Sequence, residues 1–292
     1  MQTQQMATFH KRIPAPTPKT SAIGVAVVSV AGDVGTERAD RLAVEEPLAI
    51  RIAHGPIRNR RRTTISITMR TPGHDDDLAA GLLFVEGVVA HPQQILRIEK
   101  GRSENAIRVD LHPEVVVDLS RLDRRGYTTS SCGVCGKTSI DSVEAACEGP
   151  RPGGAPIPAA VIHALPDTLR AAQPTFAQTG GLHAAALFDC TGKLLAARED
   201  VGRHNAVDKV LGAEFRAGRV PLDGRILFVS GRASFELIQK AAMAGVPVFA
   251  AVGAPSSLAV SLAARLGVTL LGFVRDGRFN IYSEPGRVRL RD

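Results

Sequence analysis

Residues 226–274 read ILFVSGRASFELIQKAAMAGVPVFAAVGAPSSLAVSLAARLGVTLLGFV. The stretch contains three apolar runs, each suited to a strand buried on both faces: residues 226–229, 246–252 and 268–274. Between them lie two stretches with helical patterning, residues 234–244 and 256–266, each closed by a glycine. Strand, helix, strand, helix, strand is the order of a parallel sheet with right-handed crossovers. The C-terminal part is therefore predicted to be an α/β unit with a largely parallel sheet.

A polar turn follows each of these predicted strands, at residues 230–234, 253–257 and 275–278. Because the carboxyl ends of parallel strands meet at one sheet edge, we expect the turns to lie together, where open α/β sheets bind ligands. Their glycines, hydroxyls, arginines and helix N-termini favour phosphate groups, so the predicted ligand is a nucleotide-like anion. The chain has neither a P-loop nor a G-x-G-x-x-G fingerprint, so a standard NTPase or dehydrogenase is not indicated. The candidate contacts are Ser230, Gly231, Arg232, Arg275, Asp276, Gly277 and Arg278.

A second dense run of functional groups spans residues 199–209, EDVGRHNAVDK. We expect this run to start a helix whose apolar stripe continues to Phe215. Capping and surface ion pairs explain its acidic residues, but they do not readily explain Arg203 and His204 together at a helix start. A helix N-terminus with such side chains suits an anion. Arg203 and His204 are therefore predicted ligand contacts, with helix capping as the alternative.

The most reactive candidate is the cysteine pair of residues 130–139, SSCGVCGKTS. Two intervening residues let Cys132 and Cys135 project from one tight turn, and the flanking glycines let a partner approach closely. A helix is predicted to follow, and its positive end, together with Lys137, favours thiolate over thiol.

Four uses of this pair compete. A structural zinc site needs four ligands, and no second C-x-x-C is present. A zinc deaminase would carry H-x-E and P-C-x-x-C, whereas His183 is followed by two alanines and Ser131 takes the proline position. A thioredoxin-like dithiol usually follows a strand, but residues 121–131 are rich in arginine, glycine and hydroxyl residues. A sulfur relay needs an exposed cysteine on a mobile tip, which the glycines suit best.

The first part of the chain predicts a β-rich α+β region. Residues 1–22 are polar, rich in proline and free of acidic residues, and predict a disordered arm. The apolar run 22–31 that follows imitates the core of a secretion signal. The three prolines and the long segment before it favour an ordinary strand instead.

Residues 47–70 predict a β-hairpin, because apolar residues alternate along both halves: Leu48, Ile50 and Ile52, then Ile65, Ile67 and Met69. Arg58 and residues 60–62 form a basic loop between them, which is either a solvated tip or a contact for an acidic partner or phosphate. Residues 75–77, three aspartates, open a helix at its positive end. They could also form a metal cluster, but first-turn charges account for them more simply. Strands are expected near residues 95–98 and 106–111.

Length and composition limit the classes of protein to which the chain can belong. The chain has 292 residues, a formal charge of +7 and a pI near 9.6, which together suit an anionic ligand. Four cysteines do not make a disulfide scaffold at this length, and no apolar run is long enough for a membrane helix. We expect a disordered arm over 1–22, a β-rich region over 23–126 and an α/β domain over 127–292.

Seven motifs occur in a characteristic order: PLAIR at 47–51, MRTPG at 69–73, SCGVCG at 131–136, TGGLH at 179–183, EDVGRHNA at 199–206, SGR at 230–232 and GRFNIY at 277–282. This set resembles the FdhD family of formate dehydrogenase accessory sulfurtransferases over residues 45 to 283. Two positions depart from the family pattern. His54 stands where asparagine is frequent, and His74 where an acid or asparagine is common.

The resemblance implies a cytidine-deaminase-like core without the zinc chemistry, in a cytoplasmic protein that is usually a dimer. It implies a carrier-like sulfurtransferase that works through a cysteine persulfide. Such a protein takes sulfur from a cysteine desulfurase and passes it to the molybdenum or tungsten bis(molybdopterin guanine dinucleotide) cofactor before insertion into the formate dehydrogenase apo-subunit. The family carries the persulfide on the position of Cys132, with Cys135 as its partner. It binds the cofactor around Phe273, Val274 and Arg275 to Arg278.

The alternative from a different class is a dithiol redox or zinc-binding accessory protein without sulfur transfer. The sulfur-carrier interpretation calls for no nucleic acid, no membrane and no structural metal. The residues and the resemblance agree on two features, a reactive cysteine tip and an anion-binding sheet edge.

Overall fold

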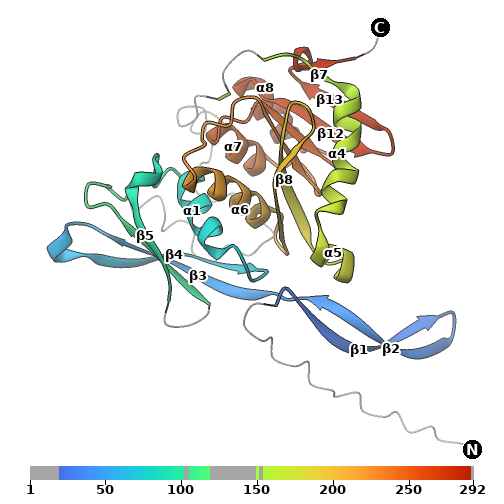
Figure 1. Ribbon diagram of the computed structural model, residues 1–292, viewed down its shortest axis with the longest axis horizontal. Helices are drawn as coiled ribbons and strands as arrows, with labels where there is room; N and C mark the ends of the chain where they lie inside the picture. Colours follow the sequence, from blue (N-terminus) through green and yellow to red (C-terminus); the bar gives the residue numbers. More distant parts are fainter. Residues whose placement is uncertain (1–19, 102–104, 119–148, 151–153, 291–292) are drawn as a thin grey trace, which may run out of the picture.

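The computed structural model describes residues 20–101, 105–118, 149–150 and 154–290 (Figure 1). Its larger sheet has six strands in the order β13-β12-β11-β10-β8-β9. The strands are β8 (His183–Asp189), β9 (Leu194–Asp200), β10 (Arg225–Val229), β11 (Val248–Ala251), β12 (Thr269–Arg275) and β13 (Arg278–Ser283). The three strands predicted from residues 226–274 are β10, β11 and β12, and they are parallel as expected. The other three pair antiparallel, so the sheet as a whole is mixed.

Helices cover both faces of this sheet. They are α4 (Ala159–Ala171), α5 (Pro174–Thr179), α6 (Arg203–Arg216), α7 (Phe235–Met243) and α8 (Ser257–Leu266). The crossover helices α7 and α8 match the predicted stretches and end at Gly245 and Gly267, whose φ angles of 71° and 68° suit glycine. Together with α6 they share one hydrophobic core with one sheet face, and α4 forms a second core with the other. None of the described helices is both long and apolar enough to cross a bilayer.

The smaller sheet has the strand order β4-β3-β6-β5. Its elements are β3 (Glu46–His54), β4 (Arg61–Arg70), β5 (Ile95–Lys100) and β6 (Ala106–Leu111), with the 3-10 turns Ile57–Asn59 and Pro92–Gln94. The predicted hairpin is confirmed as β3 and β4. Leu48, Ile50 and Ile52 are fully buried, whereas Ile67 and Met69 of β4 are 42% and 40% exposed. One face of this sheet therefore belongs to the core, and the other is open.

Helix α1 (Asp75–Val85) joins the two sheets by crossing α6. Both helices have a glycine at the crossing. A Cβ on Gly81 would overlap the carbonyl oxygen of Asp208, and a Cβ on Gly212 would overlap that of Asp77. Because the helices approach so closely, one continuous core runs from the smaller sheet to the larger one.

The N-terminal strand predicted from residues 22–31 is confirmed as β1 (Ala22–Ala31), whose one partner among the described strands is β2 (Val34–Ala43). These two strands form an arm that extends past the sheets (Figure 1). At the other end of the chain, β14 (Val288–Arg289) follows the 3-10 turn Pro285–Arg287 and pairs with β7 (Ile157–Pro158). The prediction of disorder over residues 1–22 falls mainly on residues 1–19, which lie outside the described residues, and Ala22 already belongs to β1.

Candidate functional site

The three predicted turns do meet at one sheet edge. The Gly253 N–H donates to the Gly231 carbonyl oxygen at 2.9 Å, and the Phe273 N–H donates to the Gly253 carbonyl oxygen at 3.1 Å. Ser230 is fixed from the neighbouring strand, since its hydroxyl accepts the Ala184 N–H at 2.9 Å. The turns therefore form one hydrogen-bonded rim.

A cavity of about 610 Å³ opens beside this rim. One wall is the sheet edge and the other is the C-terminal half of α4 with the segment that follows it. The lining residues are Pro166, Asp167, Leu169, Arg170, Gln173, Phe176, Gly180, Gly181, Leu182, His183, Val201, Phe228, Ser230, Val252, Arg275 and Asp276. The volume is in the range of small-molecule sites.

Two arginines line the cavity together with two aspartates, Asp167 and Asp276. Arg170 stacks on the Phe176 ring, with its guanidinium carbon 4.3 Å from the centroid. No carboxylate within the described parts of the chain forms an ion pair with Arg170. Arg275 approaches Asp276 at 3.8 Å, and both side chains are largely exposed. Among the described residues, Arg170 therefore has no ion pair, and Arg275 has only a long, solvent-exposed one.

Gln173 and His183 add hydrogen-bonding groups to the cavity. Gln173 is 4% exposed, and its Nε2 has no acceptor among the described residues. Burial lowers the pKa of His183, and the nearby Arg203 and His204 lower it further, so its imidazole is neutral at neutral pH. A buried amide donor without a partner is costly unless a ligand or water supplies the acceptor.

The predicted contacts at the strand ends are distributed unevenly. Ser230, Arg275 and Asp276 line the cavity. Phe273 adopts a φ of 54°, unusual for a bulky residue, and its ring lies 5.9 Å from the Arg275 guanidinium carbon. The Val274 side chain is fully buried in the second core. The remaining predicted residues lie outside the cavity lining: Gly231 beside His183, Arg232 exposed on its turn, and Gly277 and Arg278 at the β12–β13 turn.

Arg203 and His204 lie next to the cavity without lining it. The Arg203 side chain passes Gly231, and its Nε is buried without an acceptor among the described residues. His204 Nε2 is 2.7 Å from a carboxylate oxygen of Glu236 on α7. His204 is therefore engaged within the fold.

The expectation that residues 199–209 start a helix is wrong at its first residues. Strand β9 continues through Asp200, and α6 begins at Arg203. The Glu199 carboxylate accepts the N–H groups of Thr175 and Phe176, at 3.0 and 2.7 Å, and so fixes the first turn of α5. Glu199 and Asp200 resembled residues at a helix start, but they form hydrogen bonds with segments far away in the sequence.

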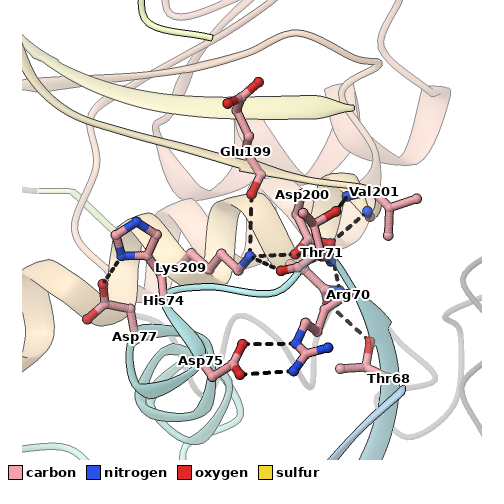
Figure 2. A network of polar contacts seen from close by, with 12 residues as sticks. Thr68, Arg70, Thr71, His74, Asp75, Asp77, Glu199, Asp200, Val201 and Lys209 are labelled. Atoms are coloured by element: carbon pink, nitrogen blue, oxygen red, sulfur yellow. Dashed lines mark hydrogen bonds and ion pairs between the residues drawn. The ribbon is translucent and has the colours of Figure 1, made fainter. Parts of the chain in front are cut away.

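Asp200 and Lys209 form a buried ion pair at 2.7 Å, with 0% and 1% of their side chains exposed (Figure 2). Thr71, which follows β4, connects to both of them: its N–H donates to Asp200 at 3.2 Å, and its carbonyl accepts from Lys209 at 2.9 Å. Asn205 donates to the Met69 carbonyl oxygen at 2.7 Å. We call these five residues the junction cluster, because they join the smaller sheet to β9 and α6.

The three aspartates at the start of α1 also have structural partners. Asp75 binds Arg70 through two hydrogen bonds, and Asp77 contacts Arg198 and Arg216. Within the described ranges, no group of three or more His, Cys, Asp or Glu residues is arranged to hold a metal ion.

Cys132 and Cys135 lie outside the described residues, so their roles stay predictions. Cys190 lies at the β8–β9 turn, as expected, and its thiol donates to the Gly224 carbonyl oxygen at 3.1 Å. Burial and the neighbouring Asp189 raise the pKa of this thiol. Cys190 is therefore a poor nucleophile.

Sequence reasoning missed Arg170, Gln173 and His183 as site residues. His183 carried a signal, since it ends the TGGLH motif at 179–183. Arg170 and Gln173 carried none, because they lie in the last turn of α4 and just before α5, far from the predicted turns in sequence.

Comparison with known proteins places this chain in a family. The model of the FdhD/NarQ family matches residues 43–289. The sulfur carrier protein FdhD of Mycobacterium tuberculosis is 50% identical over 264 residues, covering 86% of this chain and 92% of that protein. The sulfur carrier protein FdhD of Streptomyces coelicolor is 46% identical, covering 91% and 95%.

A solved structure gives the same result. The crystal structure of a putative formate dehydrogenase accessory protein from Desulfotalea psychrophila has a TM-score of 0.71 at 25% identity. The alignment covers 92% of this chain and 100% of that chain. The chain belongs to the FdhD/NarQ family.

Proposed function

We propose that this protein is a sulfur carrier that supports formate dehydrogenase. It accepts sulfur from a cysteine desulfurase and delivers it to the molybdenum or tungsten bis(molybdopterin guanine dinucleotide) cofactor before that cofactor enters the apo-enzyme. The names of the FdhD relatives support the carrier role. The cofactor is the substrate of this reaction and carries several phosphates and two guanine bases.

The observation that carries the proposal is the cavity at the sheet edge. Arg170 and Arg275 offer guanidinium groups at its wall, and charge-assisted, bidentate contacts make arginine a strong phosphate ligand. Gln173 offers a buried amide N–H that needs an acceptor, which a base carbonyl or a phosphate oxygen would supply. Two guanidinium groups and an unsatisfied amide donor together fit an anionic nucleotide.

The sulfur steps need only the two cysteines. The Cys132 thiolate attacks the outer sulfur of the desulfurase persulfide, a new S–S bond forms, and the desulfurase cysteine leaves as a thiolate. Cys135 then attacks the inner sulfur at Cys132, which yields a Cys132–Cys135 disulfide and releases sulfide to the acceptor. The two cysteines supply the two electrons that reduce the sulfane sulfur, so a dithiol reductant must later reset the pair.

Mass spectrometry tests the carrier role. After incubation with a cysteine desulfurase and cysteine, we expect an adduct of about 32 Da, one sulfur atom, that dithiothreitol removes. Cys132→Ala should abolish the adduct, whereas Cys190→Ala should retain it because Cys190 is a poor nucleophile. Stoichiometric zinc on the purified protein with no adduct would instead support the zinc-binding accessory protein.

Calorimetry with GDP tests the ligand independently of sulfur transfer. We expect GDP to bind with affinity that falls as salt rises, because arginine–phosphate contacts are screened. If GDP showed no detectable binding at low salt, the cavity would not be the nucleotide site.

A further inference from the structure

Glu199 does not line the cavity, but its side chain binds the helix that forms part of the cavity wall. It lies near the end of β9, where successive side chains point to opposite faces of the sheet. Asp200 enters the junction cluster, whereas the Glu199 carboxylate is directed away from it (Figure 2). The Glu199 carbonyl oxygen accepts from Lys209 Nζ at 3.3 Å, so the backbone beneath this carboxylate is anchored.

Helix α5 depends on Glu199 for its first turn. The first residue, a proline, has no N–H, and the fourth N–H donates to the Gln173 carbonyl oxygen at 3.0 Å. The two donors between them, on Thr175 and Phe176, both bind the Glu199 carboxylate. Gln173, at the N-cap position, forms no side-chain cap hydrogen bond. The cap therefore comes from a distant strand, and a six-residue helix is too short to be stable without such support.

Helix α5 and its flanking residues supply a large part of the cavity wall. Five of the lining residues lie in α5 or within three positions of its ends: Gln173, Phe176, Gly180, Gly181 and Leu182. The position of α5 therefore decides where these groups meet a ligand.

Phe176 connects the Glu199 cap to a guanidinium group of the cavity. The Phe176 N–H donates to Glu199 at 2.7 Å, and the Arg170 guanidinium carbon is 4.3 Å from the centroid of the Phe176 ring. Because Arg170 has no ion pair among the described residues, this ring is the contact that orients it. An arginine held in place loses less rotamer freedom when it binds an anion than a mobile one does.

We propose that Glu199 is a positioning residue for the ligand of the cavity. Glu199 does not contact the ligand. By accepting the N–H groups of Thr175 and Phe176, it holds the Phe176 ring against Arg170 and so fixes that guanidinium for binding. The inference rests on the proposed function, in which an anionic nucleotide occupies the cavity. A purely structural cap would instead lower the melting temperature and leave affinity unchanged.

Substitution of Glu199 in the full chain tests the proposal, with GDP as the probe and calorimetry well below each melting temperature as the measurement. In Glu199→Gln an amide NH₂ replaces one acceptor oxygen, so one backbone N–H loses its partner. We expect the GDP dissociation constant to rise about 10-fold. Glu199→Asp keeps both oxygens one methylene further back, so it should retain the fold and raise the constant only about 3-fold.

Glu214→Gln is the matched control. The Glu214 carboxylate is also largely buried and also accepts two hydrogen bonds, from Arg219 at 2.7 Å each. It lies near the C-terminal end of α6 and outside the cavity lining. This substitution removes a comparable pair of contacts, so the melting temperature should fall while GDP affinity stays the same.

A double-mutant cycle tests the route through Arg170. In an Arg170→Ala background the oriented guanidinium is absent, so Glu199→Gln should raise the GDP dissociation constant by less than about 3-fold. A further 10-fold rise in that background, unchanged affinity in Glu199→Gln, or an equal loss of affinity in Glu214→Gln would each overturn the proposal. A wild type that binds no GDP would overturn the proposed ligand as well. Unchanged affinity in Glu199→Gln alone leaves the proposed function standing.

Discussion

The junction cluster and the cavity are both polar regions beside the larger sheet, but they differ in how their charges are satisfied. In the junction cluster, Asp200 and Lys209 are buried and each has partners within the protein. In the cavity, Arg170 stacks on a ring without an ion pair among the described residues, and the Gln173 amide lacks an acceptor there. The first region is complete, and the second lacks partners that a ligand can supply.

Whether polar groups have partners within the protein distinguishes structural residues from binding residues better than residue type does. Both regions contain arginine or lysine, carboxylates and amides, and both lie on family motifs or next to them. A satisfied buried cluster stabilises the joint between two sheets. A cluster with unsatisfied polar groups lowers stability, and it is retained where ligand binding requires those groups. Substitutions should therefore affect folding in one region and ligand affinity in the other.

The largest expected effect is in the junction cluster. Lys209→Met removes one partner of a buried pair and leaves the Asp200 carboxylate uncompensated, which should lower the free energy of unfolding by about 3–5 kcal/mol. Chemical denaturation measures this loss. Asp200→Asn with Lys209→Met together should cost less than the two single changes added. A loss below about 1 kcal/mol for Lys209→Met would mean that the joint does not depend on the ion pair.

The cavity should show the reverse pattern. Arg170→Ala with Arg275→Ala removes two phosphate contacts, each worth about 1.5–3 kcal/mol, so GDP affinity should fall more than about 100-fold. The free energy of unfolding should change by less than about 1 kcal/mol. Arg289→Ala is the matched control, since Arg289 is exposed on β14 and lies outside the cavity lining. Unchanged GDP affinity in the double variant would move the ligand to another site.

Gln173 offers a finer test. Gln173→Ala removes a buried donor that lacks an acceptor in the described part of the chain, so stability should hold or rise slightly while GDP affinity falls about 5- to 50-fold. Gln239→Ala, on a partly exposed position of α7, is the control. A lower melting temperature with unchanged GDP affinity would assign Gln173 to the structure instead.

The smallest effect is a pH dependence outside the cavity. Burial alone would raise the pKa of Asp77, but hydrogen bonds from His74, Arg216 and Arg198 outweigh it and lower the pKa to about 2. Its unfolded value is about 3.9, so Asp77 stabilises the fold above about pH 4 and loses that contribution as pH falls towards 2. The contribution is about 1–2 kcal/mol after allowance for solvent.

Asp77→Asn should remove this part of the pH dependence in acid denaturation curves. Asp76→Asn is the control, because the Asp76 carboxylate is 44% exposed and 3.7 Å from Arg216. Identical acid profiles for the wild type and Asp77→Asn would show that Asp77 does not titrate with folding.

The sequence predicted the parts of the fold in which one local pattern dominates. The buried runs of β10 to β12 and the glycines that end α7 and α8 needed no tertiary information. Glu199 and Asp200 were misassigned because their partners, α5 and Thr71, are far away in the chain. Polar residues at a strand end and at a helix start look alike until those partners are known.

The candidate site divides in the same way. Ser230, Arg275 and Asp276 follow buried strands, so topology alone brought them to one edge. Arg170 and Gln173 reach the cavity only because α4 packs across the opposite face of the sheet, which no local pattern encodes. The sequence alone therefore predicts residues of the sheet-edge wall, whereas the residues of the α4 wall depend on how the helix packs.

The short helix α5 belongs to the arm and to the cavity at once. The Ser21 hydroxyl at the arm's base contacts the Thr175 hydroxyl at 3.0 Å, while Phe176 and the preceding Gln173 line the cavity. Linkage is reciprocal, so a ligand that changed the free energy of the α5–arm contact would itself be bound more or less tightly when that contact is altered. One helical turn therefore touches both the base of the arm and the wall of the cavity.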